Sequence, residues 1–295
     1  MHAKSLTLFD LAPGKDLLGQ YTIRRAHRQG GMSTTFEVED KKRKSACEVQ
    51  VFPSALFENA QQAREFSDSL SAWTRVDSKH VLTSYDVHVL EDGSILYVTD
   101  MPVGTSLREW LRAHPVSPAA TVIDIGCQLL EGLSAVHAAG LVHGDIKPHT
   151  IQISGGQTDS GKHLRLVLAD GGITPGLWTA KHLGEKTALI GTPFYAPIEQ
   201  FGGESPNVQS DIYNVATVLF EITTGTIPWK GKSFIEVFQS KLEKHPPAMK
   251  SRAPKVDVPA ALEDAIAGGL MADKSERYAT AEEFRKQLLA AKAAS

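Results

Sequence analysis

The chain has 295 residues, 42% of them hydrophobic, with 31 basic and 34 acidic side chains and a formal net charge of −3. This length and apolar fraction suit one two-lobed domain with a sizeable core. The near-neutral charge gives no reason to expect nucleic acid or an anionic membrane as a partner. Two cysteines without paired spacing, no long apolar run and no signal-peptide core predict a cytoplasmic protein without membrane insertion.

The first third of the chain is expected to form a small lobe rich in strands. Residues 1–18 are interpreted as a lead-in segment, and residues 19–100 as the lobe itself. Five strands are predicted at residues 21–25, 35–39, 47–52, 83–90 and 95–99, with one main helix over residues 60–76. The basic run at residues 41–44 fits either a solvated hairpin tip or a docking patch.

Residues 101–295 are expected to form a second, mostly helical lobe. Apolar residues at helical spacing predict helices over residues 118–139 and 208–224. Ser106 with Glu109, and Thr280 with Glu283, form capping-box patterns that indicate two further helix starts. A strand-rich lobe followed by a helical lobe predicts an α+β architecture.

Short motifs in a fixed order run along both predicted lobes. Residues 141–148 read Leu-Val-His-Gly-Asp-Ile-Lys-Pro, residues 169–172 read Ala-Asp-Gly-Gly, and residues 191–195 read Gly-Thr-Pro-Phe-Tyr. With an arginine motif at residues 273–278, they resemble the bacterial Hanks-type serine/threonine protein kinases over about residues 20–292. The resemblance is to a degenerate member, a pseudokinase. It implies a bilobal protein-kinase-like fold with a five-stranded small lobe, one main small-lobe helix and a mostly helical large lobe.

Several catalytic positions of that family are retained. Asp145 matches the aspartate that accepts the substrate hydroxyl proton, and Lys147 matches the lysine that steadies the transferred phosphoryl group. Asp170 matches the aspartate that holds magnesium. Thr150 stands where the family has its second metal ligand, normally asparagine, and a hydroxyl is a weaker magnesium ligand than an amide carbonyl.

The positions that hold the ATP phosphates are altered. Gln50 stands in place of the strand lysine, and Ser69 in place of the helix glutamate that orients it. In the glycine-rich loop only the middle glycine, Gly30, remains, because Arg28 and Ser33 replace the first and third. A neutral amide does not offset phosphate charge, so phosphate binding is expected to be lost. Arg28 as a substitute phosphate binder is the alternative.

The adenine pocket is also expected to be degenerate, with Thr35 and Glu48 above the base and Asp100 at the end of the last small-lobe strand. Burying an ionised carboxylate at position 48 costs several kcal/mol or more. A local bulge that turns Glu48 to solvent is the alternative.

Two further departures concern regulation. Gly144 replaces the arginine that receives an activation-loop phosphate, so phosphorylation at Thr179 or Thr187 is not expected to act as the switch. Gly171 replaces a phenylalanine that packs between the lobes, and Trp73 on the small-lobe helix is predicted to fill that space.

The fold-holding positions match better than the chemical ones. Glu199 and Arg277 match a buried ion pair of the family, and Asp211 matches the aspartate that binds the catalytic-loop backbone. We therefore expect a pseudokinase that acts as a scaffold for protein partners, with a homodimer through the small lobe as a further option and no cofactor.

Two alternatives stay open. One is a slow serine/threonine kinase that uses Mg-ATP with Asp145, Lys147 and Asp170, and the other is a domain that senses nucleotide without transfer.

Overall fold

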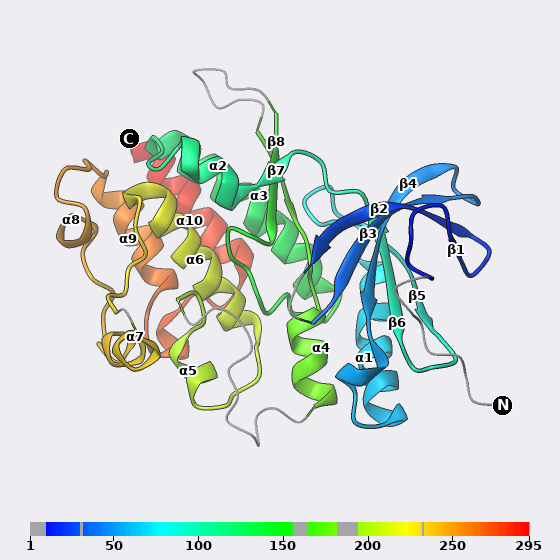
Figure 1. The fold of residues 1–295 in the computed structure, drawn as a ribbon. Coiled ribbons are helices and arrows are strands. Elements are labelled where there is room, and N and C mark those ends of the chain that lie inside the picture. Colours follow the sequence, from blue (N-terminus) through cyan, green and yellow to red (C-terminus); the bar gives the residue numbers. More distant parts are fainter. Residues whose placement is uncertain (1–9, 30–31, 156–163, 182–193, 232, 295) are drawn as a thin grey trace.

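The computed structural model describes residues 10–29, 32–155, 164–181, 194–231 and 233–294. A strand-rich lobe and a helical lobe lie side by side and are joined by the chain after β6 (Figure 1). The predicted α+β, two-lobed architecture is therefore confirmed.

The small lobe is built on a six-stranded antiparallel sheet in the order β1-β2-β3-β4-β6-β5. All five predicted strands are present, and a two-residue strand, β1, adds a sixth by pairing Leu17 with Tyr21. The end of the lead-in segment thus belongs to the sheet, because both of these side chains are buried in its core. The strands are β1 (Asp16–Leu17), β2 (Tyr21–Gln29), β3 (Thr34–Asp40), β4 (Ser45–Phe52), β5 (Ser84–Val89) and β6 (Ile95–Asp100).

One main helix, α1 (Ala60–Ser71), packs on this sheet. It begins at Asn59, whose side chain accepts a hydrogen bond from the backbone N–H of Gln62 at 3.0 Å. The predicted helix over residues 60–76 continues only as a short 3₁₀ turn, Ala72–Arg75, which carries Trp73.

The large lobe is mostly helical and holds a small three-stranded sheet, β7-β8-β9. Helix α6 is buried along nearly its whole length and forms the centre of the lobe. The Ser106 capping box is present in full, and Thr280 accepts from the backbone N–H of Glu283 at 3.1 Å. The described elements are β7 (Thr105–Ser106), α2 (Leu107–Ala113), α3 (Ala119–Ala138), β8 (Ile151–Ser154), β9 (Arg165–Leu168), α4 (Ile173–Ala180), α5 (Ile198–Phe201), α6 (Val208–Thr224), α7 (Phe234–Lys241), α8 (Met249–Arg252), α9 (Ala260–Gly269) and α10 (Ala281–Ala294).

Helix α3 is long and apolar enough to cross a membrane when judged by length and composition alone. In the described structure it packs against α6 and α10, and its apolar side chains join the core of the large lobe. This packing is typical of the central helix of a folded lobe. The length and composition of α3 are therefore only weak evidence that it spans a membrane.

Helix α4 joins the two lobes because its apolar side chains complete the core of the small lobe. Ile173 and Leu177 lie in one cluster with Phe66 and Leu70 of α1. Figure 1 shows α4 beside α1, and Lys181 after α4 donates to the backbone carbonyl of Leu56 at 2.7 Å.

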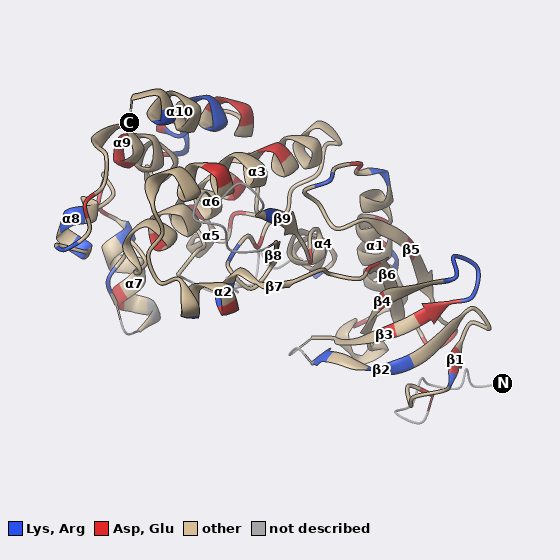
Figure 2. Cartoon of the chain, turned by 90° about the horizontal axis from the view of Figure 1, so that it is seen from above, with Lys and Arg blue, Asp and Glu red and all other residues tan. Residues whose placement is uncertain are grey.

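The basic turn between β3 and β4 lies in a small lobe that also carries acidic residues (Figure 2), and two of its side chains form ion pairs with them. Lys41 pairs with Asp16 at 2.8 Å, and Arg43 pairs with the buried Asp40 at 2.7 Å. Two of the four basic side chains therefore have a structural role in this lobe.

Candidate functional site

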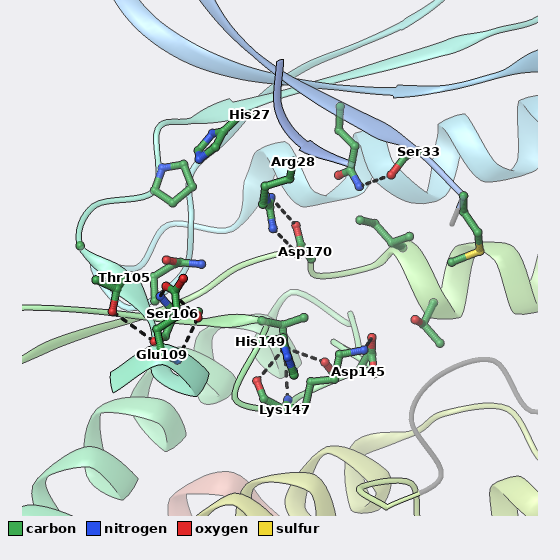
Figure 3. Close-up of a pocket in the computed structure, with 18 of the residues that line it drawn as sticks. His27, Arg28, Ser33, Thr105, Ser106, Glu109, Asp145, Lys147, His149 and Asp170 are labelled. Carbon is green, nitrogen blue, oxygen red and sulfur yellow. Dashed lines mark hydrogen bonds and ion pairs between the residues drawn. The ribbon is translucent and has the colours of Figure 1, made fainter. Parts of the chain in front are cut away.

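A cavity of about 600 Å³ lies between the lobes. It is lined by β2 and the chain after it, by the linker between the lobes, by the catalytic-loop residues and by the segment after β9 (Figure 3). The retained residues Asp145, Lys147 and Asp170 all line it, together with Gln50 and Thr150. The structure therefore brings together the two predicted catalytic residues and the two predicted metal ligands.

The catalytic loop is held by one carboxylate from the centre of the large lobe. Asp211 of α6 accepts hydrogen bonds from the backbone N–H groups of His143 and Gly144, each at 2.8 Å. The predicted role of Asp211 is confirmed, and it fixes the direction in which the loop presents its side chains.

Gly144 has a φ of +79°, which disfavours any residue with a side chain. A Cβ at this position would also lie 2.5 Å from the ring of Pro175. An arginine therefore does not fit here without rearrangement. Thr179 is exposed on α4, and Thr187 lies outside the described residues.

Asp145 and Lys147 form an ion pair at 2.6 Å inside the cavity. Burial raises the pKa of the Asp145 carboxyl above its usual value, and the charge of Lys147 opposes this shift. The Thr150 hydroxyl donates to the backbone carbonyl of Asp145 at 2.8 Å. Thr150 thus braces the backbone of the catalytic loop.

Asp170 is held by an arginine from the other lobe. Both of its oxygens accept from the guanidinium of Arg28, at 3.0 and 3.1 Å, across 142 residues of sequence. The backbone of Asp170 is in the left-handed region at a φ of +60°, which non-glycine residues adopt rarely. The carboxylate that matches the family's magnesium ligand therefore already has a cation as its partner.

The same guanidinium binds Glu48, which is only 2% exposed. The distance from Arg28 Nη2 to Glu48 Oε1 is 2.6 Å. Burial raises the pKa of the Glu48 carboxyl to about 7 despite the opposing charge of Arg28. Residues of β3 and β4 pair without a register shift, with Glu37 opposite Glu48, so the alternative in which a bulge turns Glu48 to solvent is wrong.

A bulge is found instead in β2, where the register skips His27 between Ala26 and Arg28. Neighbouring residues of a regular strand point to opposite faces. His27 and Arg28 nevertheless both line the cavity, because the bulge redirects the strand.

Gln50 and Ser69, which stand at the predicted lysine and glutamate positions, contact different neighbours. The Gln50 amide donates to the Ser33 hydroxyl at 2.7 Å. Ser69 faces α4, where its hydroxyl would lie 2.9 Å from a Cβ placed on Gly176. Of the two carboxylates on α1, Glu65 accepts a hydrogen bond from Gln61 and Asp68 is exposed, so neither is recorded in contact with Gln50.

Two other predicted pocket residues, Thr35 and Asp100, do not line the cavity, and a third cannot be placed. Gly30 lies outside the described residues. Thr35 is buried in the sheet and is not among the side chains that line the cavity. Asp100 is exposed at the end of β6 and accepts from the backbone N–H of Met101 at 2.9 Å, whereas Thr99 is buried and lies beside Glu48.

Sequence reasoning missed several residues that line the cavity, among them His27, Pro102 and Gln152. Pro102 lies in the linker between the lobes and has no backbone N–H to donate to a ligand. Gln152 of β8 places a polar amide on the cavity floor. The sequence offered two signals, a proline three residues after a predicted strand and a glutamine between two isoleucines.

The residues present do not fit a magnesium–nucleotide group in this arrangement. Both oxygens of Asp170 bind Arg28, and the Thr150 hydroxyl binds the loop backbone. Among the described residues there is also no group of three or more His, Cys, Asp and Glu side chains that would hold a metal ion.

Trp73 is buried between the lobes, as predicted, at 3% exposure. Its indole ring lies over Gly171 and Gly172 and contacts His143 edge-on at 6.0 Å between ring centres. A Cβ on Gly171 would lie well inside van der Waals contact with this ring. The glycine at position 171 is therefore what admits the tryptophan.

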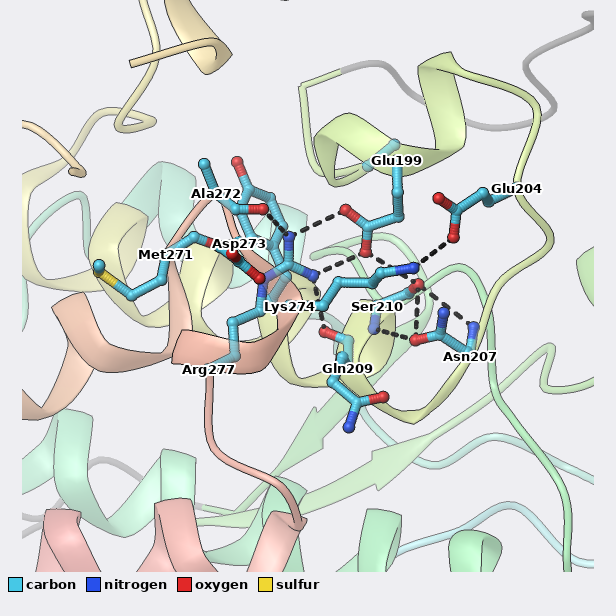
Figure 4. A network of polar contacts seen from close by, with 12 residues as sticks. Glu199, Glu204, Asn207, Gln209, Ser210, Met271, Ala272, Asp273, Lys274 and Arg277 are labelled. Atoms are coloured by element: carbon cyan, nitrogen blue, oxygen red, sulfur yellow. Dashed lines mark hydrogen bonds and ion pairs between the residues drawn. The ribbon is translucent and has the colours of Figure 1, made fainter. Parts of the chain in front are cut away.

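The buried ion pair of the large lobe is present as predicted (Figure 4). Arg277 binds both oxygens of Glu199, at 2.7 and 2.9 Å, and its side chain is fully buried. Arg277 also donates to the backbone carbonyls of Met271 and Ala272. These bonds tie the segment after α9 to α5.

The sequence profile of the protein kinase domain matches residues 22–289. The chain belongs to the protein kinase family. It is 26% identical over 279 residues to the serine/threonine-protein kinase pkn3 of Myxococcus xanthus, covering 94% of this chain and 51% of that protein. It is also 26% identical to the serine/threonine-protein kinase PrkC of Bacillus subtilis, covering 93% of this chain and 41% of that protein.

The solved kinase domain of PknI from Mycobacterium tuberculosis has the same fold. Its TM-score is 0.73 at 20% identity, over 95% of this chain and 99% of that domain. The chain spans about half the length of the curated kinases that it matches. The kinase fold and the relationship to bacterial serine/threonine kinases are thus established.

Proposed function

We propose that this kinase-family domain is a pseudokinase with impaired or absent ATP binding and phosphoryl transfer. The observation that carries the proposal is the contact between Arg28 and Asp170. An internal guanidinium binds both oxygens of the carboxylate that a magnesium ion would need. A metal would have to displace this arginine before it could bind.

Three other features support the proposal. Gln50 offers an amide where a lysine would neutralise phosphate charge, and its amide is bound to Ser33. Pro102 offers no N–H in the linker. Behind the main cavity, the described residues leave only about 10 Å³ beside Glu48 and Trp73, which is room for about one water molecule and not for an adenine ring.

The corresponding role is that of a cytoplasmic scaffold that binds a protein partner. The intact Glu199–Arg277 pair and the Asp211 bonds support this role, because they keep the large lobe folded without ligand. A homodimer through the small lobe is the form of self-association that we propose to test, by sedimentation of the purified domain.

The experiment is a pair of assays with the kinase domain of PrkC as a positive control. Thermal unfolding is measured with and without millimolar Mg-ATP, and radiolabel transfer is measured in the same buffer. We expect Mg-ATP to leave the melting temperature unchanged, because a ligand that does not bind the folded state does not stabilise it. We also expect no transfer of the radiolabelled phosphoryl group. A rise of several degrees with Mg-ATP would refute the loss of binding.

A slow serine/threonine kinase is the second candidate, because Asp145 and Lys147 line an open cavity. It predicts weak labelling that Asp145→Asn abolishes. Labelling that persists in Asp145→Asn comes from a contaminant. A magnesium-dependent shift without any labelling would favour the nucleotide sensor.

A further inference from the structure

The Arg28 guanidinium is held in the cleft as a bound ligand would be. It makes a two-pronged contact with Asp170 from the large lobe, and a third bond to Glu48 from the small lobe. The Glu48 side chain is 3% exposed and the Asp170 side chain 22% exposed. Planar guanidinium groups favour this geometry because their N–H donors form a rigid fork.

The two carboxylates come from elements that are fixed independently of Arg28. Glu48 is set by the unshifted pairing of β4 with β3 and β6. Asp170 follows β9, which pairs with β8. Two carboxylates that face one cleft disfavour each other's charge unless a cation lies between them.

The neighbouring groups do not supply that cation. Burial, together with repulsion from Arg28, lowers the pKa of the His27 imidazole below its usual value, which favours its neutral form. Lys147 is engaged by Asp145. One Glu48 oxygen lies 3.0 Å from His27 Nδ1 without a hydrogen bond, so the buried carboxylate still has an unused acceptor.

We propose that Glu48 and Asp170 form a guanidinium-binding site between the lobes, which the chain fills with its own Arg28. The filled site holds the lobes together in the absence of nucleotide. The ligand class is a guanidinium group, because a single planar cation reaches carboxylates on both sides of the cleft. This inference rests on the proposed function in that it takes the cleft as free of nucleotide.

Arg25 provides a matched control. It lies on the same strand and pairs with Glu37 at 2.7 Å, but its side chain is 67% exposed. Hydrogen exchange of Arg28→Ala and Arg25→Ala is compared in nucleotide-free buffer. In Arg28→Ala we expect exchange in β4 and around Asp170 to accelerate by about tenfold or more, and in Arg25→Ala to stay unchanged.

Chemical rescue then tests the ligand class. Millimolar guanidinium chloride is expected to restore the protection lost in Arg28→Ala, whereas equal concentrations of urea or sodium chloride are not. Arg28→Lys keeps a cation but lacks the fork, so it is expected to retain part of the protection. If Arg28→Ala does not fold, Arg28→Lys takes its place in the comparison of hydrogen exchange with Arg25→Ala.

Equal exchange in Arg28→Ala and Arg25→Ala would overturn the proposal, as would rescue by sodium chloride as effective as rescue by guanidinium. These outcomes are separate from those of the proposed function. Mg-ATP binding by the unmodified domain would refute the loss of nucleotide binding. The proposal of a guanidinium site is refuted only by the hydrogen-exchange and rescue comparisons of the variants, which are made without nucleotide.

Discussion

Replacing Trp73 and Gly171 singly and together tests how the lobes pack. The Trp73 ring fills the space over Gly171, and the side chain is almost fully buried. Trp73→Ala removes a large buried aromatic group and is expected to cost about 3–5 kcal/mol of unfolding free energy. Gly171→Ala inserts a methyl group against the ring and is expected to cost about 1–3 kcal/mol by overpacking.

The double variant carries the decisive comparison. Once Trp73 is alanine, the methyl group at position 171 enters the vacated space, so Gly171→Ala should cost little in that background. The double variant is therefore expected to be more stable than the sum of the single effects by about 1–3 kcal/mol. Chemical denaturation with tryptophan-independent detection by circular dichroism measures all four proteins.

Additive single effects would contradict this packing, because they would mean that the ring does not lie over residue 171. A near-neutral Trp73→Ala would mean that the indole is exposed in solution, as a partner contact would be.

Three further predictions concern charge. Glu48 has a folded pKa of about 7 against 4.5 when unfolded, so its contribution to stability is greatest below pH 4.5 and falls by about 3 kcal/mol as pH rises through 7. Glu48→Gln still faces Arg28, Asp170 and His27 but has no carboxyl group to titrate. Its free energy of unfolding relative to that of the wild type should therefore rise by that amount between pH 5 and 8. If urea denaturation gives a difference between the two proteins that does not change with pH, the pKa shift is contradicted. Arg277→Ala should cost about 3–5 kcal/mol by leaving a buried carboxylate unpaired, and an unchanged melting temperature would show that the pair is dispensable. Gln50→Lys alone should not restore ATP binding, because Arg28 still occupies both oxygens of Asp170; nucleotide binding by this variant in calorimetry would contradict that reasoning.

The sequence by itself determined the elements and the family. Strand alternation, helical spacing and capping boxes are local signals, and they located the five main strands, α1, α3 and α6 close to their observed bounds. The motifs also identified Asp211, Trp73 and the Glu199–Arg277 pair, because these positions carry recognisable residue types in a fixed order. Gln50 and Ser69 showed from residue identity alone that the lysine and the glutamate are missing.

Only the tertiary structure decided what replaces them. Arg28 and Asp170 are 142 residues apart, so no local pattern predicts that they meet. The β2 bulge that directs Arg28 into the cleft depends on how β2 pairs with β3, and strand direction decided that Glu48 faces inward while Asp100 faces solvent. The direction of these side chains depends on the register of the strands, since a shift of one residue would turn them to the opposite face of the sheet. The contact between Arg28 and Asp170 depends in addition on how the two lobes pack.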